Sequence, residues 1–208
     1  MPSQGERPAR RGPRARGAVR SALVDAGLEL ARAGGPDAVV LREVTRAVGV
    51  APNAAYRHFS DRDALLAAVR DEAVKELAGR MAAGMGRVRA GPHTPMGARL
   101  RLRAVGEAYL EFARTEPGLF DTAFAARDRP VGEGSDEPTP LHHLQAALDN
   151  LVSAGILAAD RRPNIEYAIW SSVHGLAVLL RGPLQWLPER EQARLEAQLF
   201  TFIGAAVG

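Results

Sequence analysis

Several neighbouring residues near position 55 carry side chains that can hydrogen-bond with nucleic-acid bases and phosphates. The segment 52–59 (PNAAYRHF) contains an amide, a phenol, a guanidinium and an imidazole within six positions. If this segment is a short helix, Ala55 and Phe59 face inward. The residues left to solvent are then Pro52, Asn53, Tyr56, Arg57 and His58. A short helix with these groups suits the major groove of DNA, with core packing as the alternative for Tyr56.

The excess of positive charge lies in the same part of the chain. The formal net charge is +3, and residues 1–62 hold 11 Arg against six Asp and Glu. The remaining residues hold 16 Arg and Lys against 18 Asp and Glu. A GC-rich genome would explain the preference for Arg over Lys, but not its gathering at one end. This distribution favours a partner that carries phosphates.

The segment 41–59 predicts two short helices joined by a tight turn. Gly49 stands where the chain must reverse, because glycine adopts a left-handed backbone without strain. Val50 fills the turn, and Pro52 suits the first position of the second helix. The inner face of the first helix is formed by Leu41, Val44 and Val48.

The rest of the chain also has helical periodicity, and no window alternates as a strand would. We therefore predict an all-α fold of about nine helices, with a three-helix helix-turn-helix domain at the N-terminus and a helical domain after it. Residues 1–17, rich in Pro, Gly and Arg, predict an unfolded segment, and residues 127–140 predict a flexible connection. Ser60, with Asp63 three residues later, predicts the N-cap of the fourth helix.

Length and composition exclude several classes of protein. The 208 residues suffice for one large or two small domains. There is no cysteine, which excludes disulfides, thiolate zinc sites, iron–sulfur clusters and thiol catalysis. The apolar run 168–180 is too short for a membrane span, and the basic N-terminus lacks the apolar stretch of a signal peptide. We expect a soluble, cytoplasmic protein.

Residues 18–69 resemble the N-terminal domain of the TetR family of bacterial transcriptional regulators. The resemblance rests on Gly49-Val50, on Tyr56-x-His58-Phe59 and on the run 61–66 (DRDALL). In addition, 116–120 (EPGLF) and Trp170-x-x-x-His174-Gly175-Leu176 resemble a subgroup marked by a Trp-His-Gly motif. The resemblance implies a DNA-binding domain over 18–62 and a ligand-binding and dimerisation domain over 63–208, after a disordered basic arm at 1–17.

The resemblance also implies which residues contact DNA. These positions are Arg42, Thr45, Pro52, Asn53, Tyr56, Arg57, His58 and Arg62. Arg62 stands where the family usually has lysine, and we expect its guanidinium to keep the phosphate contact. We also expect the Thr45 hydroxyl to bond back to its own helix. Val40 and Ala51 stand where the family often has a capping Ser or Thr, at a cost of about 1 kcal/mol for each missing cap.

The arginines of the N-terminal segment have two interpretations. They are Arg7, Arg10, Arg11, Arg14 and Arg16. They could lie along phosphates or in a minor groove and add to the salt dependence of binding. Alternatively they form a solvated tail.

A small-molecule site is expected in the second domain. Its candidate residues are Met81, Met85, Tyr109, Phe112, Phe120, Phe124, Trp170 and His174. His174 lies one turn after Trp170 and is the best polar group in an otherwise apolar segment. The alternative for each residue is ordinary core packing. As a set they favour an apolar or aromatic ligand.

The segment 168–180 is apolar nearly all round, which predicts that a second subunit covers it. A ninth helix offers a further apolar face, made by Leu195, Leu199, Phe202 and Ala206. We expect a homodimer through the last two helices, joined as a four-helix bundle. The alternative is a central helix buried within one subunit.

No catalytic motif is present in the sequence. It lacks H-E-x-x-H, G-x-S-x-G and P-loop patterns, and the adjacent His142 and His143 cannot chelate as an i, i+4 pair would. We expect no metal, no cofactor and no enzymatic activity. The leading hypothesis is a dimeric repressor that binds a palindromic operator and is released by a small molecule. The alternatives are an all-α carrier or enzyme whose helix-turn-helix is only structural, and a nucleoid-type protein that binds DNA without sequence preference.

Overall fold

The computed structural model describes residues 13–125 and 137–208. Across these two ranges every regular element is a helix, with nine α-helices and two short 3₁₀-helices, which confirms the predicted fold class. No helix in them is long and apolar enough to cross a membrane. The α-helices are α1 (Pro13–Gly34), α2 (Leu41–Val48), α3 (Pro52–Ala55), α4 (Arg62–Gly86), α5 (Pro95–Thr115), α6 (Pro117–Phe124), α7 (Pro140–Ser153), α8 (Ile165–Arg181) and α9 (Glu189–Val207); the 3₁₀-helices are η1 (Pro36–Ala38) and η2 (Ala159–Arg161).

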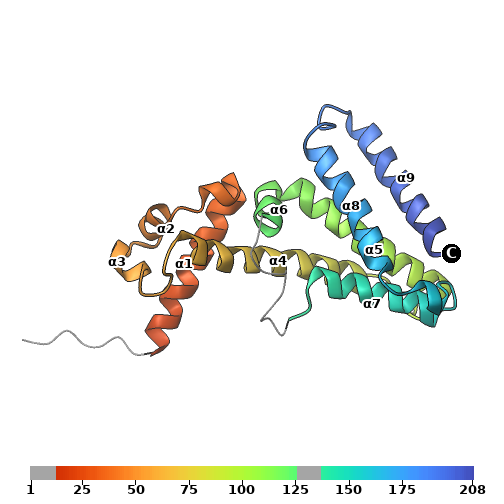
Figure 1. Cartoon of the computed structure of the whole chain (residues 1–208), viewed down its shortest axis with the longest axis horizontal. Helices are drawn as coiled ribbons and strands as arrows, with labels where there is room; N and C mark the ends of the chain where they lie inside the picture. Colours follow the sequence, from red (N-terminus) through yellow and green to blue (C-terminus); the bar gives the residue numbers. More distant parts are fainter. Residues whose placement is uncertain (1–12, 126–136) are drawn as a thin grey trace, which may run out of the picture.

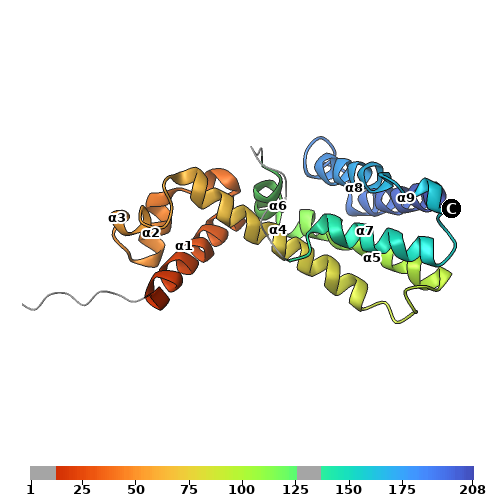
Figure 2. The same cartoon turned by 60° about the horizontal axis from the view of Figure 1, so that its bottom comes forward.

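Helix α4 links the two ends of the molecule (Figure 1). Its first turns pack against α1, and further along it packs against α5, α6 and α7. Helices α8 and α9 run antiparallel at the outer edge of the second part, with α8 resting on α5 (Figures 1 and 2). Helix α6 also packs against α1, so a displacement of α4 or α6 would change the packing at both ends of the molecule.

The apolar core of the molecule extends into the N-terminal end. Leu23 of α1, Val44 of α2 and Leu65 of α4 are fully buried, and Ala55 and Phe59 are buried beside them. These are the positions that helical spacing assigns to the inner faces. Helices α1, α2 and α3 and the start of α4 thus pack together.

Helix α1 starts earlier than the sequence predicted. It begins at Pro13, so residues 13–17 are helical in backbone. Proline suits the first turn of a helix, and the Arg and Ala residues that follow are good helix formers. The rest of the proposed arm, with Arg7, Arg10 and Arg11, lies outside the described residues, as does most of the connection expected at 127–140.

The N-cap of α4 is Asp61, and the prediction of Ser60 was wrong. The Asp61 carboxylate accepts a hydrogen bond from the Ala64 amide (2.8 Å), and the Ser60 hydroxyl donates to the same carboxylate (2.9 Å). A carboxylate is favoured over a hydroxyl here because the amino end of a helix carries partial positive charge. The bond from Ala64, followed by that from Ser60, holds the pKa of Asp61 below its usual value.

Candidate functional site

The turn between α2 and α3 has the predicted geometry. Helix α2 ends at Gly49, whose φ of 71° and ψ of 30° lie in the left-handed region. Val40 and Ala51 occupy the N-cap positions of α2 and α3 without any side-chain cap, as expected. Pro52 then opens α3, which makes one helical turn and is shorter than the predicted 52–59. The His58 and Phe59 amides both donate to the Ala55 carbonyl, so hydrogen-bonded turns continue the segment.

The polar side chains of this segment face solvent together. Pro52, Asn53, Tyr56 and Arg57 are exposed, and His58 is half-buried. The Tyr56 residue is 57% exposed, which argues against core packing as its role. An amide, a phenol and a guanidinium are therefore free to meet base edges or phosphates on the outer face of α3 and the following turn.

Helix α2 adds two arginines to the same end of the molecule. The Arg42 side chain is 85% exposed, and Arg46, one turn later, is similarly open. Glu43 contacts both guanidiniums, at 3.5 Å and 2.5 Å respectively. Such exposed ion pairs are worth little, so both arginines remain available to phosphates. Sequence reasoning named Arg42 and missed Arg46. The spacing of four residues, which places both arginines on the same face of one helix, could have identified Arg46.

Two predicted DNA-contacting residues, Thr45 and Arg62, make hydrogen bonds within the protein. Thr45 is only 2% exposed, and its hydroxyl donates to the Arg42 carbonyl (2.9 Å), which confirms the predicted bond to its own helix. A group so buried is not within reach of DNA. Arg62 donates to the carbonyls of Val39 (2.9 Å) and Pro36 (2.7 Å), so its guanidinium fastens the start of α4 to η1.

A cavity of about 190 Å³ lies between α4, α5, α7, α8 and α9. Its wall is mostly apolar, and the charged residues of the wall are Arg99 and Arg103 of α5. Three of the eight predicted ligand residues line it: Met81, Tyr109 and Trp170. Sequence reasoning missed the contributions of α7 and α9, and on α9 it singled out a different face, made by Leu195, Leu199, Phe202 and Ala206.

The other five predicted ligand residues lie outside the cavity wall. Phe112 is fully buried beneath the Arg80 guanidinium, and Met85 is half-buried near the end of α4. Phe120, Phe124 and His174 instead form an aromatic cluster with Tyr109 and Trp170, with ring centroids 4.9 to 6.5 Å apart. Because Tyr109 and Trp170 belong to both groups, the cluster backs directly onto the cavity.

A short hydrogen-bond chain joins the cavity wall to this cluster. The Trp170 indole N–H donates to the Tyr109 oxygen (3.1 Å), which lies 2.8 Å from Nδ1 of His174. We assign the phenol proton to Nδ1, since this nitrogen is the acceptor within reach. Burial raises the pKa of Tyr109 and lowers the pKa of His174, so both groups are held neutral near pH 7.

The two ends of the molecule meet through a four-residue ion network. Arg32 of α1 donates to Glu76 of α4 (2.9 Å) and to Glu116, which precedes α6. Arg80 of α4 donates to the same two carboxylates, at 2.9 Å and 2.8 Å. Burial alone would raise the pKa of Glu76, but the hydrogen bonds from Arg32 and Arg80 outweigh it and hold the pKa below its usual value. The network ties α1 to α4 and to the start of α6.

Helix α6 is also held on its other side. Arg181 of α8 donates to both carboxylate oxygens of Asp121 (2.7 Å each) and lies over the Phe120 ring. Phe120 and Phe124 of α6 are members of the aromatic cluster. The first turn of α6 packs against α1. Helix α6 thus lies between the cavity and the N-terminal helices.

The described residues offer no site for a metal ion made by three or more His, Asp or Glu. His142 is exposed, and its Nδ1 accepts a hydrogen bond from the Thr139 amide (3.0 Å), which caps α7. Its neighbour His143 is half-buried. His142 is thus part of the N-terminal cap of α7.

Two family models match the chain. The model described as "Bacterial regulatory proteins, tetR family" matches residues 23–69. The model described as "Tetracyclin repressor-like, C-terminal domain" matches residues 102–202. Together they span more than two thirds of the chain and reach both the helix-turn-helix and the cavity-forming helices. A search of curated proteins found none that matches the chain.

Solved structures share the fold along nearly the whole chain. A protein of unknown function from Rhodococcus sp. RHA1 is 23% identical, with a TM-score of 0.64, and the match covers 94% of this chain and 98% of that one. A TetR-family transcriptional regulator from Pectobacterium atrosepticum is 22% identical, with a TM-score of 0.62 and coverage of 93% and 94%. A putative tetR family transcription regulator from Shewanella sp. PV-4 is 17% identical, with a TM-score of 0.58 and coverage of 88% and 96%. With both domains matched in order, this chain belongs to the TetR family of bacterial transcriptional regulators.

Proposed function

We propose that this protein is a repressor that binds a palindromic operator as a homodimer and leaves it when a small, largely apolar or aromatic molecule binds. One observation carries the proposal. At one end of α4 the exposed side chains of α2 and α3 can read DNA, and at the other end an apolar cavity can hold a ligand. The competing idea of a carrier or enzyme leaves the exposed Asn53, Tyr56 and Arg57 without a role.

The DNA step divides between base and phosphate contacts. We assign base edges in the major groove to Asn53 and Arg57, because an amide and a guanidinium can form bidentate pairs there. Tyr56 and the half-buried His58 are assigned to phosphates, together with Arg42 and Arg46 of α2. Arg46 takes the place that Thr45 held in the sequence-based prediction, and the part-exposed Arg62 keeps its predicted phosphate contact.

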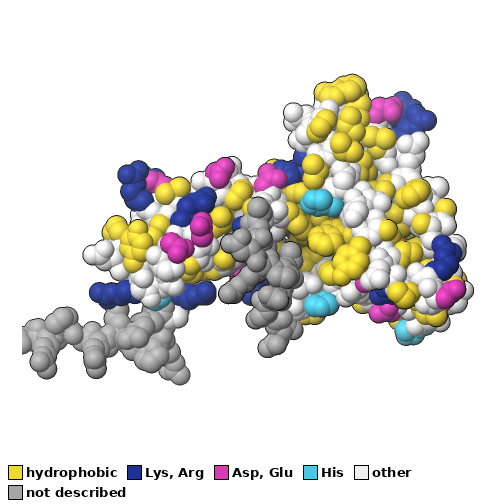
Figure 3. All heavy atoms as spheres, viewed as in Figure 1, with side chains coloured by type: hydrophobic (Ala, Val, Ile, Leu, Met, Phe, Trp, Pro, Cys, Tyr) yellow, Lys and Arg dark blue, Asp and Glu magenta, His cyan; other side chains and the backbone are white. Residues whose placement is uncertain are grey.

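The dimer step uses the outer face of α8 and α9. Tyr167, Val178 and Leu179 of α8 are exposed, and Phe202 of α9 is 64% exposed. Figure 3 shows apolar side chains gathered over this part of the molecule. A helix buried within one subunit would not leave these side chains open, which supports a second copy as their cover. A twofold protein would then read half-sites about one helical turn apart.

The release step would pass through α6. A ligand in the cavity contacts Tyr109 and Trp170, whose rings pack on Phe124 of α6. Helix α6 in turn packs on α1, and α1 packs on α2. A ligand that favours one position of α6 would thereby shift the position of the DNA-facing helices.

Two finer assignments belong to the same proposal. The C-terminal family match spans Trp170, His174 and Gly175, and we place the chain in the subgroup marked by this Trp-His-Gly motif. Trp170 and His174 both bond to Tyr109, which gives the motif a packing role beside the cavity. Because its operator would be chromosomal, we also place the protein in the cytoplasm.

The test is selection of duplexes from a random pool by the purified protein, with enriched sites measured again across a salt series. An enriched palindrome bound with a steep salt slope supports the proposal. Tyr56→Ala and Arg57→Ala should each lower operator affinity about tenfold or more, whereas Arg89→Ala, an exposed arginine of the α4–α5 loop, should not. Binding without enrichment would favour a non-specific DNA-binding protein, and no binding at low salt would favour a carrier or enzyme.

A further inference from the structure

We propose that the molecule bound in the cavity is an amphipathic anion: an apolar body about the size of one aromatic ring that carries a carboxylate. This inference rests on the effector site proposed above and specifies the chemistry of its ligand. Three features of the cavity carry it, namely its volume, the state of its inner polar groups and the charge at its open side.

The volume sets the size of the apolar body. An apolar cavity of about 150 Å³ holds a benzene molecule. The cavity here is about 190 Å³ and is walled by branched aliphatic side chains from three helices, among them Val105, Ile169, Val173 and Ile203. One phenyl ring, or a short alkyl chain of similar volume, therefore fits within it.

The polar groups deep in the wall are already satisfied. The Trp170 indole N–H is used by Tyr109, and the Tyr109 hydroxyl is used by His174. An indole has one donor and a phenol has one proton, so neither has a further hydrogen to offer a ligand. Recognition at this end is then a matter of shape and apolar contact.

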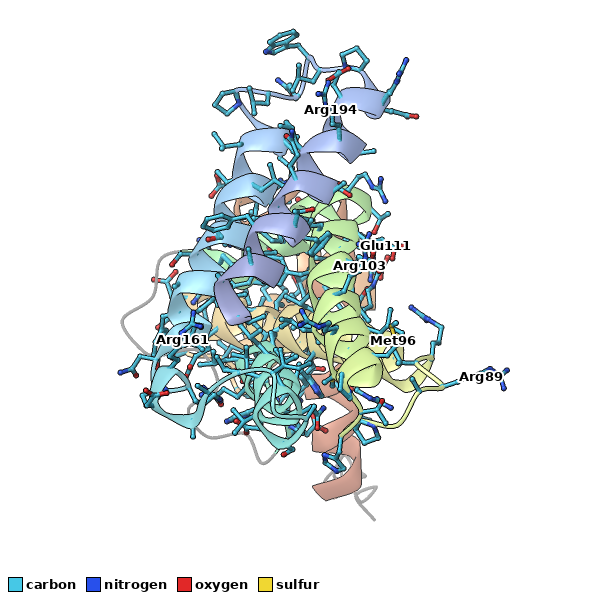
Figure 4. All side chains as sticks on the ribbon, turned by 90° about the vertical axis from the view of Figure 1, so that its right-hand side faces the viewer. Arg89, Met96, Arg103, Glu111, Arg161 and Arg194 are labelled. Atoms are coloured by element: carbon cyan, nitrogen blue, oxygen red, sulfur yellow. The ribbon has the colours of Figure 1, made fainter. Side chains whose placement is uncertain are left out.

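The open side of the cavity, unlike its inner end, carries positive charge. Arg99 and Arg103, one turn apart on α5, are exposed there, and no Asp or Glu from the described ranges is part of the wall. Figure 4 labels Arg103 on α5 beside α9, where its guanidinium lies 5.2 Å from the centroid of the Phe200 ring. Phe200 is itself part of the wall, so positive charge directly adjoins the apolar interior.

Both arginines keep donors for a ligand. Arg103 donates its Nε–H to Glu107 (2.7 Å) in an exposed pair, and Arg99 donates to the Gly208 carbonyl (2.6 Å). A guanidinium has five N–H donors, and an exposed pair four residues apart is worth little. A carboxylate at the open side would gain charge-assisted hydrogen bonds that a hydroxyl or an amine on the same body would not.

The test uses the full chain with Trp186→Phe, which leaves Trp170 in the cavity wall as the single fluorescent indole. Benzoate, phenylacetate and hydrocinnamate are titrated at pH 7, each beside the alcohol and the amine with the same phenyl body. We expect at least one carboxylate to change Trp170 emission with a Kd about tenfold below that of its alcohol. The amine should bind more weakly than the alcohol.

Three variants locate the charge that makes the difference. Arg103→Gln and Arg99→Gln should each weaken the carboxylate and leave the alcohol unchanged. Arg114→Gln removes an exposed charge from the same helix outside the cavity wall and should change neither. Because all three arginines are exposed, the fold should survive each change, which circular dichroism checks.

Equal affinity of alcohol and carboxylate, equal loss of both in the Arg99 and Arg103 variants, or no response of Trp170 to any carboxylate would overturn the inference. The titrations contain no DNA, so their outcome is separate from operator binding. Operator binding together with an alcohol that binds as well as its carboxylate would remove this inference and leave the repressor standing. Carboxylate binding by a protein that does not bind DNA would support the ligand chemistry and remove the repressor.

Discussion

Replacing Gly118 with alanine should push α6 away from α1. Gly118 is buried in the first turn of α6 and packs against the last turn of α1. A Cβ atom at this position would lie 2.2 Å from the Ala31 carbonyl oxygen and 2.6 Å from that of Arg32. Carbon–oxygen contacts are comfortable from about 3.3 Å, so the helices must part by roughly 1 Å. Both obstacles are backbone atoms, and no side-chain rotation can relieve them.

The magnitude follows from two opposing effects. Overpacking of this kind costs about 1–3 kcal/mol, and a clash with backbone belongs at the upper end. Alanine regains up to about 1 kcal/mol of helix propensity over glycine. Gly118→Ala should therefore lower the free energy of unfolding by about 2 kcal/mol, which for a chain of this size is a Tm lower by roughly 4–8 °C.

The matched control is Gly79→Ala in α4, where a new Cβ meets nothing within 4 Å. The same chemical change should raise stability there by up to about 1 kcal/mol. Both variants are compared by urea unfolding and by operator affinity, which only Gly118→Ala should weaken, since it displaces α1. If the two variants were equally stable and bound operator equally, the tight contact between α6 and α1 would not exist in solution.

Three further changes test single features of the structure. Asp61→Ala removes the cap of α4 and should cost about 1 kcal/mol in urea unfolding, whereas Asp63→Ala, in the first turn but not the cap, should cost less. Glu116→Gln takes an acceptor of charged hydrogen bonds from the junction of α1, α4 and α6 and should cost about 2 kcal/mol. Glu111→Gln, on the exposed face of α5, should be neutral, and equal losses in the two would mean that the junction contributes nothing. Burial lowers the pKa of His174 in the folded protein, so as pH drops the imidazole is protonated in the unfolded chain before it is protonated in the folded one. The free energy of unfolding should therefore fall as pH drops below about 6.5. His174→Asn should lose less stability than the parent between pH 7 and pH 5, as measured by Tm, and an unchanged slope would contradict a neutral, buried imidazole.

The pattern of local sequence was sufficient to predict the helices and the turn between α2 and α3. Apolar residues at helical spacing mark each amphipathic helix, and Gly49 and Pro52 mark the left-handed turn and the start of the next helix. These signals work because they depend on neighbours within four residues. The exposure of Asn53, Tyr56 and Arg57 follows from the same local geometry, since Ala55 and Phe59 face inward.

Local pattern was not sufficient where partners come from distant parts of the chain. The bonds from Arg62 to the carbonyls of Pro36 and Val39 could not be predicted, because these partners lie 26 and 23 residues earlier in the chain. Asp61 displaced Ser60 as the cap because neighbouring groups compete for one amide, and their exact placement decides the outcome.

The cavity is the clearest case of a feature decided by tertiary structure. Phe120, Phe124 and His174 have the types expected of a ligand site, yet they pack on one another behind its wall. Arg103 and Phe200 lie far apart in sequence and meet only because α9 returns alongside α5. Periodicity tells which face of a helix is apolar, but not which helix covers that face or where a gap is left. The sequence by itself therefore determined the helices and their inner faces, and only long-range packing decided which side chains surround the cavity.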